Sequence, residues 1–273
     1  MHRIFLKLGW LARYSGHFLE ECGWAYKHFG WTAVAFRARS TARNLVYLLK
    51  SRTSHRVTCP CCEWTGHDFM TVPGETFLLH RCECPRCGAQ QRQRVLHQYI
   101  LRHDPALLRI EGLVVHSAPE ASMVKLLRRI PRARYLMIDI DASKIVANRG
   151  TGFRTDLRHL ALPPDSVDFF LCLHVLEHID DDRAAIAEIR RALKPGGLVY
   201  FMVPMHLDRP DTIEFGSARP EVYGHYRTYG RDFKDRLAAF DTREILPRDF
   251  LDEAESERIG SRDEEIIYRC TKP

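Results

Sequence analysis

Apolar residues follow two alternating patterns in the second half of this chain, short continuous runs and helical spacings. The runs are rich in Val, Leu, Ile, Phe and Tyr, and they cover 113–118, 134–140, 168–175, 198–204 and 265–272. Between them, helical spacing predicts helices over 123–130 and 182–193. Strands alternating with helices predict crossover connections and a mostly parallel sheet covered on both faces. The predicted fold class is therefore α/β, with a doubly wound sheet over 91–273.

Residues 1–56 follow a different pattern, in which aromatic and basic side chains interleave. Apolar spacing predicts helices, one of them along Leu45, Leu48 and Leu49, with interruptions near Gly16, Gly23 and Gly30. This segment carries ten Lys and Arg but two Glu, whereas the whole chain has a net charge of +6. We interpret it as a basic helical arm on a nearly neutral body. Three roles are open for this arm: packing on the main domain, contact with an anionic membrane surface, or docking of a substrate or nucleic acid.

Residues 57–90 contain two Cys-x2-Cys pairs separated by 21 residues, and they predict a small zinc-ribbon-like module. The four thiolates of Cys59, Cys62, Cys84 and Cys87 suit a closed, tetrahedral and structural zinc site. Four nearby side chains are alternative ligands: Cys61, Cys82, His67 and His80.

The distribution of the cysteines also indicates the cellular compartment. Six of the nine cysteines lie within 59–87, and we identify neither a secretory signal nor an apolar run of membrane-spanning length. We therefore expect a cytoplasmic, metal-binding protein, with peripheral contact to the inner face of a membrane through residues 1–56 as an alternative.

The turn after the first run, which should carry a glycine-rich loop, reads His116-Ser117-Ala118-Pro119-Glu120. Ala118 adds a single methyl group, and Glu120 would repel phosphate, so the turn favours an uncharged or cationic ligand. Asp139 ends the next predicted strand, 21 residues beyond Ala118, where an acid commonly binds ribose hydroxyls. Asp141 is the nearby alternative.

Three further strings carry a resemblance to a known family. They are RYLMIDID, the stretch from Asp156 through LPPDSVDFFLCLHVLEH, and LKPGG followed by LVYFMVP. As a set they resemble class I S-adenosylmethionine-dependent methyltransferases of the type 11 kind. The turn departs from the usual D-x-G-x-G and resembles a sub-branch reading L-H-x-A-P-E, preceded by a zinc knuckle.

The resemblance implies S-adenosylmethionine as cofactor and a Rossmann-like fold. Asp139 would hold the ribose, Asp156 the adenine amino group, and Leu157 would give backbone contacts. His116, Ala118 and Glu120 would border the methionine end, where Glu120 could pair with the ammonium group. His174 would face the sulfonium and the substrate.

The sequence also offers residues for the reaction itself. Candidate general bases are His174, His206 and His225, with His178 nearby. The segment YGHYRTYGRDF resembles a substrate-binding insertion, in which Arg227 and Tyr229 would contact the acceptor. The alternative is a loop latch in which Arg227 pairs with Asp232.

These features predict methyl transfer to a small-molecule, sugar or lipid-linked acceptor, most simply at a hydroxyl group. The run over 168–175 and the residues just after it lack the Asn/Asp-Pro-Pro-aromatic string of enzymes that methylate the amino groups of bases. Two alternatives remain: an RNA-modifying methyltransferase that uses the zinc module and the basic arm, and a non-catalytic protein that keeps the fold.

Overall fold

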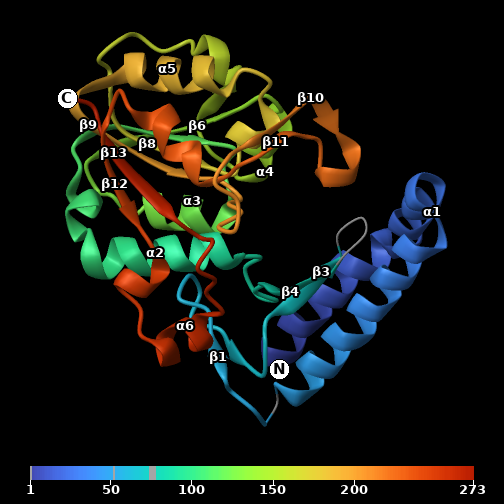
Figure 1. Cartoon of the computed structure of the whole chain (residues 1–273). Helices are drawn as coiled ribbons and strands as arrows, with labels where there is room; N and C mark the ends of the chain where they lie inside the picture. Colours follow the sequence, from blue (N-terminus) through green and yellow to red (C-terminus); the bar gives the residue numbers. More distant parts are fainter. Residues whose placement is uncertain (1, 52, 74–77) are drawn as a thin grey trace.

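A computed structural model describes residues 2–51, 53–73 and 78–273, and side chains are described from Cys22 onward except at 24, 28 and 29. The chain forms a helical hairpin, a small cysteine-bearing module and an α/β body (Figure 1). The predicted aromatic and basic side chains before residue 22 lie outside the described residues.

The α/β body is built on a seven-stranded sheet in the order β12-β13-β9-β8-β5-β6-β7. Its strands are β5 (Gly112–Ser117), β6 (Ala133–Asp139), β7 (Gly152–Arg154), β8 (Val167–Leu173), β9 (Leu193–Met202), β12 (Asp241–Ile245) and β13 (Ile267–Thr271). The pairs among β5 to β9 are parallel, and β13 runs antiparallel to both of its neighbours. The prediction of a mostly parallel, doubly wound sheet is confirmed. Chain order reverses between β5 and β8, so a ligand site is expected beyond the carboxyl ends of these strands.

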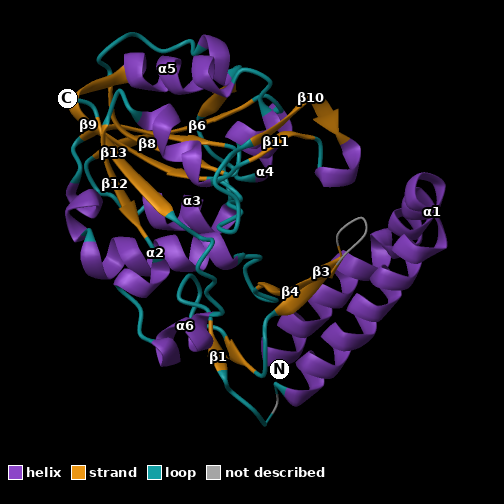
Figure 2. Ribbon diagram, viewed as in Figure 1, coloured by secondary structure: helices purple, strands orange, loops and turns teal. Residues whose placement is uncertain are grey.

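Helices cover both faces of the sheet (Figure 2). The α-helices of the body are α2 (Gln91–His103), α3 (Ala121–Leu127), α4 (Ala142–Ala147), α5 (Asp182–Ala192) and α6 (Glu253–Ile259). Short 3-10 helices connect them: η1 (Pro105–Arg109), η2 (Leu157–His159), η3 (Leu176–His178), η4 (Pro220–Val222), η5 (Arg231–Leu237) and η6 (Pro247–Asp249). Apolar side chains of α2 and α3 pack on one face, and Ala185, Ile186 and Ile189 of α5 pack on the other. Alternate strand residues such as Phe169 and Phe170 therefore enter different cores, as the side-chain alternation of a strand requires.

Residues His2–Lys50 form α1, which folds back on itself as two antiparallel helices (Figure 1). Gly30 makes the reversal with φ 71° and ψ −167°, a backbone conformation that glycine adopts without steric cost. The predicted interruptions near Gly16 and Gly23 are wrong, because within the described part of α1 the backbone departs from helical geometry at Gly30.

The second half of the hairpin packs on the cysteine-bearing module rather than on the sheet. The module contains β1 (Val57–Thr58), β2 (Thr65–Gly66), β3 (Met70–Pro73) and β4 (Leu78–Glu83), paired as β1 with β2 and β3 with β4. The buried side-chain amide of Asn44 donates to the Thr71 carbonyl at 2.8 Å and accepts from the Thr71 amide at 2.8 Å. A helix side chain thus takes the place of a neighbouring strand at the edge of β3.

A last hairpin, β10 (Ile213–Arg219) with β11 (His225–Thr228), lies near the carboxyl ends of the parallel strands. β11 contacts η3, the short helix that follows β8.

Candidate functional site

A cavity of about 290 Å³ lies beyond the carboxyl ends of β5, β6 and β8. Each of these strands ends in a loop that contributes to the wall, because parallel strands bring their carboxyl ends to one edge. The lining residues are Ser117, Ala118, Asp139, Ile140, Thr155, Asp156, Leu157, Arg158, Val175, His178, Ile179, Asp180 and Tyr226.

Asp139 and Asp156, the two acids predicted to hold adenosine, line this same cavity. Asp139 ends β6, and the Thr155 amide donates to the Asp139 carbonyl at 2.9 Å, which brings Asp156 to the tip of the neighbouring strand. One carboxylate oxygen of Asp139 accepts from the Asp141 amide at 2.7 Å. Asp141 instead begins α4 by accepting from the Ser143 amide, so Asp139 is the acid that faces the cavity.

The Asp156 carboxylate is held in place by Arg158. It caps η2 by accepting from the Arg158 amide, and the Arg158 guanidinium lies 2.6 Å from Oδ2. This hydrogen-bonded pair lowers the pKa of Asp156, so the carboxylate is charged at neutral pH. Arg158 also pairs with Asp180 at 2.5 Å, across the cavity rim.

Ala118 occupies the turn that glycine usually fills. Its φ is 48°, in the left-handed region, and its amide donates to the Ile138 carbonyl at 2.9 Å. An L-residue held there carries strain of about 1–2 kcal/mol. The turn therefore keeps its sharp geometry without glycine, and its small methyl group borders the cavity.

A second cavity of about 1000 Å³ adjoins the first, and His178 lines both. Its walls come from the β3–β4 module, α2, the loops after β8 and β9, and the β10–β11 hairpin. All three predicted bases, His174, His206 and His225, line it. A molecule bound in the smaller cavity and one in the larger would meet near His178.

His174 follows β8 with φ 50°, a left-handed conformation that is uncommon for a residue with a Cβ atom. Its Nδ1 lies 3.8 Å from Glu177 Oε1, and its Nε2 lies 3.9 Å from Glu265 Oε2. Burial, with Arg92 nearby, lowers its pKa well below the ordinary value. His174 is therefore neutral at pH 7. Burial raises the pKa of Glu177 to about 8 and that of Glu265 to about 7.

His116 and Glu120 line neither cavity, contrary to the expectation that they border the cofactor. His116 is completely buried on β5, where its Nδ1 lies 2.8 Å from the Tyr135 hydroxyl. The Glu120 carboxylate accepts from the Arg92 guanidinium at 2.7 and 3.0 Å. Unlike Asp156, which is also held by an arginine, Glu120 lies outside both cavities.

Arg227 and Tyr229, predicted to contact substrate, are buried inside the protein instead. The Arg227 guanidinium donates to the carbonyls of Leu176 and Ile179 and to Glu214, which ties β11 to η3. The Tyr229 hydroxyl donates to Asp182 at 2.6 Å. The alternative of a loop latch predicted that Arg227 pairs with Asp232. Arg227 does hold two segments together, but its acidic partner is Glu214, and Asp232 accepts from the Thr212 hydroxyl.

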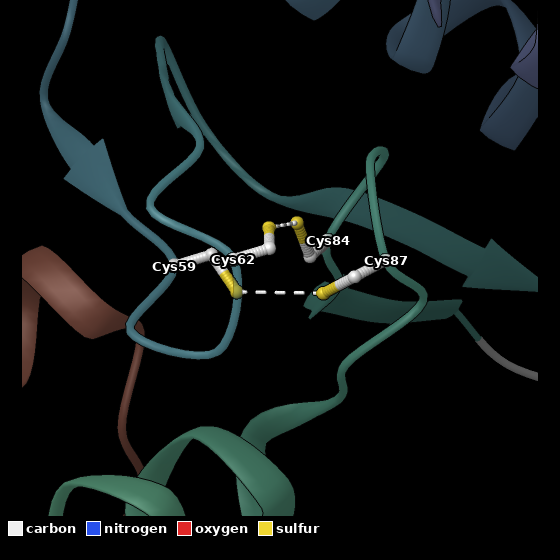
Figure 3. Close-up of side chains that lie close together, drawn as sticks. All are labelled: Cys59, Cys62, Cys84 and Cys87. Atoms are coloured by element: carbon white, nitrogen blue, oxygen red, sulfur yellow. Dashed lines mark hydrogen bonds between the residues drawn. The ribbon is translucent and has the colours of Figure 1, made fainter. Parts of the chain in front are cut away.

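The four predicted zinc ligands converge in the module (Figure 3). Their sulfur atoms all lie within 4.8 Å of one another, with 3.7 Å from Cys59 to Cys87 and from Cys62 to Cys84. The alternative ligands lie elsewhere: the Cys61 thiol faces the Gln93 carbonyl, His67 faces Ser54, and His80 faces Arg43. Burial raises the pKa of the remaining alternative, Cys82, to about 11, so it is a neutral thiol.

Several lining residues were not predicted from the sequence. Tyr226 reaches the smaller cavity from a segment remote in sequence, which no local pattern reveals, whereas Val175 directly follows the predicted site residue His174. Ile140 had a usable signal in the sequence, because it directly follows the strand-end acid Asp139. In the larger cavity, Arg92 and Glu265 come from α2 and from the segment before β13.

Comparisons with known proteins bear on this arrangement. Residues 118–201 match a family model described as a methyltransferase domain. An S-adenosylmethionine-dependent methyltransferase of Mycolicibacterium smegmatis is 31% identical over 100 residues, which are 35% of this chain and 37% of that protein. The chain thus matches well under half the length of this curated relative.

Two solved structures are also similar. An S-adenosylmethionine-dependent methyltransferase from Mesorhizobium loti has 19% identity and a TM-score of 0.47, covering 62% of this chain and 97% of that chain. The N-methyltransferase NodS from Bradyrhizobium japonicum has 17% identity and a TM-score of 0.46, covering 67% and 97%. The family match therefore covers residues 118–201, and the sheet that contains them has the Rossmann-like topology of class I methyltransferases.

Proposed function

We propose that this protein transfers a methyl group from S-adenosylmethionine to a hydroxyl group of a small-molecule, sugar or lipid-linked acceptor. The observation that carries the proposal is the pair of adjoining cavities. One contains two strand-end acids, the other contains three histidines, and His178 stands between them.

The smaller cavity suits adenosine chemically. The carboxylates of Asp139 and Asp156 would accept from ribose hydroxyl and adenine amino groups, and Leu157, Val175 and Ile179 offer apolar contact. When bound, the cofactor supplies an activated methyl group on a sulfonium. The protein then has to orient the acceptor oxygen, which contributes up to about 7–11 kcal/mol to the barrier reduction.

The larger cavity favours a polar acceptor of considerable size. It is lined by histidines, by Glu177, Glu264, Glu265 and Asp208, and by Arg92 and Arg262. Such a wall offers hydrogen bonds to several hydroxyl groups, as a sugar-like molecule presents. We propose His174 as the general base, because it lies in this wall directly after β8 and its ring is neutral at pH 7.

Calorimetry with S-adenosylhomocysteine tests the cofactor part of this proposal. We expect binding to the wild-type protein and a loss of about 10-fold to 100-fold in Asp139→Ala and Asp156→Ala, since a hydrogen bond to a charged group contributes about 1.5–3 kcal/mol. Asp141→Ala is the matched control, and it should bind normally. Absence of binding at millimolar concentration, or equal binding by all variants, would contradict the proposal.

We further propose that Cys59, Cys62, Cys84 and Cys87 hold a structural Zn²⁺. Four thiols at this separation fit the tetrahedral S4 ligand set, and such a closed site leaves no position for substrate. Its role would be to fold a module whose own apolar core is small.

For the helical hairpin we propose peripheral contact with anionic lipid, which would favour a lipid-linked acceptor. Large exposed apolar side chains gather on it: Tyr26, Trp31, Leu45, Val46 and Leu49. Lys27, Arg39 and Lys50 are exposed beside them. Among the described residues, none of the helices combines the length and apolar character that a membrane span requires, so the contact would be interfacial.

Vesicle sedimentation tests the hairpin proposal. We expect binding to vesicles containing phosphatidylserine, reduced by Leu45→Asp and Leu49→Asp and unchanged by Val146→Asp, whose apolar side chain is 74% exposed on α4 of the body. Equal sedimentation by all variants would contradict it. Salt-sensitive binding to RNA in place of vesicles would favour an RNA-modifying enzyme.

A further inference from the structure

Glu177, His178 and His225 form a cluster in the wall of the larger cavity. Each offers one ligand atom, and these three atoms lie within 4.8 Å of one another. The rings of His178 and His225 stand edge to face, with centroids 4.6 Å apart. The cysteine cluster lies in a separate module, so this is a different site.

The elements that carry these side chains are fixed relative to each other. Glu177 and His178 lie on η3, and His225 begins β11. The buried Arg227 guanidinium donates to the carbonyls of Leu176, the first residue of η3, and Ile179, the residue after it. Arg227 therefore fixes β11 to η3 and holds the two histidines at a set distance, as a preformed ligand site requires.

The carboxyl group of Glu177 gives a second, independent indication of a ligand site. Its side chain is 1% exposed, and its Oε2 is buried without a hydrogen-bond partner among the described residues. A buried carboxylate oxygen without a partner is costly, and such groups are rare in folded proteins. The charges of Arg92 and Arg227 act on Glu177, but these guanidinium groups donate to Glu120 and Glu214 respectively.

We propose that Glu177, His178 and His225 bind a divalent transition-metal ion that holds the acceptor hydroxyl in the larger cavity. Two imidazoles and one carboxylate are a set that binds Zn²⁺, Fe²⁺ or Mn²⁺ while leaving coordination positions open. Because the three residues line the cavity, the open positions face the space in which an acceptor would bind.

The proposal rests on the proposed methyl transfer and deepens it. An ion at this place would lower the pKa of a hydroxyl bound to it, as metals do for water. The hydroxyl proton passes to solvent or to neutral His174. The oxygen lone pair then forms the bond to the methyl carbon, and the electrons of the broken sulfur–carbon bond stay on sulfur.

The test uses the full chain with its cysteine site saturated with Zn²⁺. Mn²⁺ is titrated, and the electron paramagnetic resonance signal of the free ion is followed. We expect one Mn²⁺ per chain and affinity reduced more than about tenfold by His178→Gln and His225→Gln, since even the loss of a supporting outer partner commonly costs that much. Glu177→Gln, which keeps the buried shape, should act likewise.

His206→Gln is the matched control, because His206 lines the same cavity outside the cluster. It should leave Mn²⁺ affinity unchanged. Absence of Mn²⁺ binding at millimolar concentration, or equal affinity in all variants, would overturn the metal site. Calorimetry with S-adenosylhomocysteine on the same samples separates the two proposals. Cofactor binding without Mn²⁺ overturns the metal site alone, whereas Mn²⁺ binding without cofactor overturns the methyl transfer.

Discussion

The guanidinium carbon of Arg94 lies 3.7 Å from the centre of the Phe69 ring, and the cation is completely buried. Arg94 belongs to α2 of the body, whereas Phe69 belongs to the core of the cysteine module. The same guanidinium donates to carbonyls of both parts: Arg81, Cys82, Ala89, Ile259 and Gly260. One side chain thus joins the module to the body.

Replacing Arg94 by Met should lower the free energy of unfolding by at least about 3 kcal/mol, because several buried carbonyls lose their donors and each loss costs about 1–3 kcal/mol. Arg94→Lys should recover only part of this, since an ammonium cannot reproduce the planar fork. Urea denaturation measures the effect. Arg183→Met, at an exposed position of α5, should change stability by less than about 0.5 kcal/mol. Equal midpoints for Arg94→Met and wild type would contradict this role.

The cysteine cluster predicts a thiolate-bound metal that is needed for folding. Cobalt substitution should give sulfur-to-cobalt absorption in the wild-type protein, a signal that the nitrogen and oxygen ligands of the His178 cluster cannot produce. Cys84→Ser should abolish that absorption and strongly destabilise the module, because structural zinc contributes on the order of 10 kcal/mol of apparent binding energy.

Cys82→Ala is the control for this prediction. Its thiol is buried close by in sequence but lies outside the cluster, so cobalt absorption should persist. Loss of the signal in Cys82→Ala but not in Cys84→Ser would show that the ligands are assigned wrongly.

The burial of His116 predicts that the folded protein loses stability in acid. Burial lowers its pKa to about 3, whereas the unfolded chain titrates near 6.5. The unfolded state therefore binds a proton that the folded state rejects. The stabilising contribution of neutral His116 is complete above pH 6.5 and falls by up to about 1.4 kcal/mol per pH unit as the pH drops toward 3.

A pair of variants isolates this effect. Tyr135→Phe removes the hydroxyl that contacts His116 at 2.8 Å, and His116→Leu is then added to it. The difference in unfolding free energy between the two variants should change with pH between 6.5 and 4. A constant difference across that range would show that His116 titrates normally in the folded protein.

The fold could be predicted from the sequence because its signals are local. Buried strands such as β8 read as continuous apolar runs, and α5 reads as an amphipathic helix, so the alternation specifies the sheet class. The hairpin of α1 could not be located in the same way. Gly16, Gly23 and Gly30 are equivalent as letters, and contacts remote in sequence, such as those of Ser40 and Asn44 with Thr71, fix where the second limb lies.

The candidate site was predictable to the extent that it depends on strand ends. Asp139 and Asp156 follow neighbouring parallel strands, and topology alone brings such residues to one cavity. The hydrogen-bond partners of Glu120 and Arg227 could not be predicted, because they are remote in sequence. Arg92 is 28 residues from Glu120, and the Leu176 carbonyl is 51 residues from Arg227. A charged residue in a motif looks available for ligand binding until such partners are known.

Ala118 tests whether the turn still works as a cofactor loop without glycine. Its φ of 48° suits glycine, tolerates alanine with strain and strongly disfavours a β-branched side chain. Ala118→Gly should leave stability within about 1 kcal/mol of wild type, because relief of strain offsets the greater flexibility of the unfolded chain. Ala118→Val should destabilise the protein by about 1–3 kcal/mol and intrude on the smaller cavity.

Calorimetry with S-adenosylhomocysteine should therefore find binding kept in the glycine variant and lost in the valine variant. Ala142→Val, at an exposed helical position of α4, controls for β-branching alone and should bind normally. If the valine variant binds as well as wild type, the cofactor does not approach this turn, and the smaller cavity holds something other than S-adenosylmethionine.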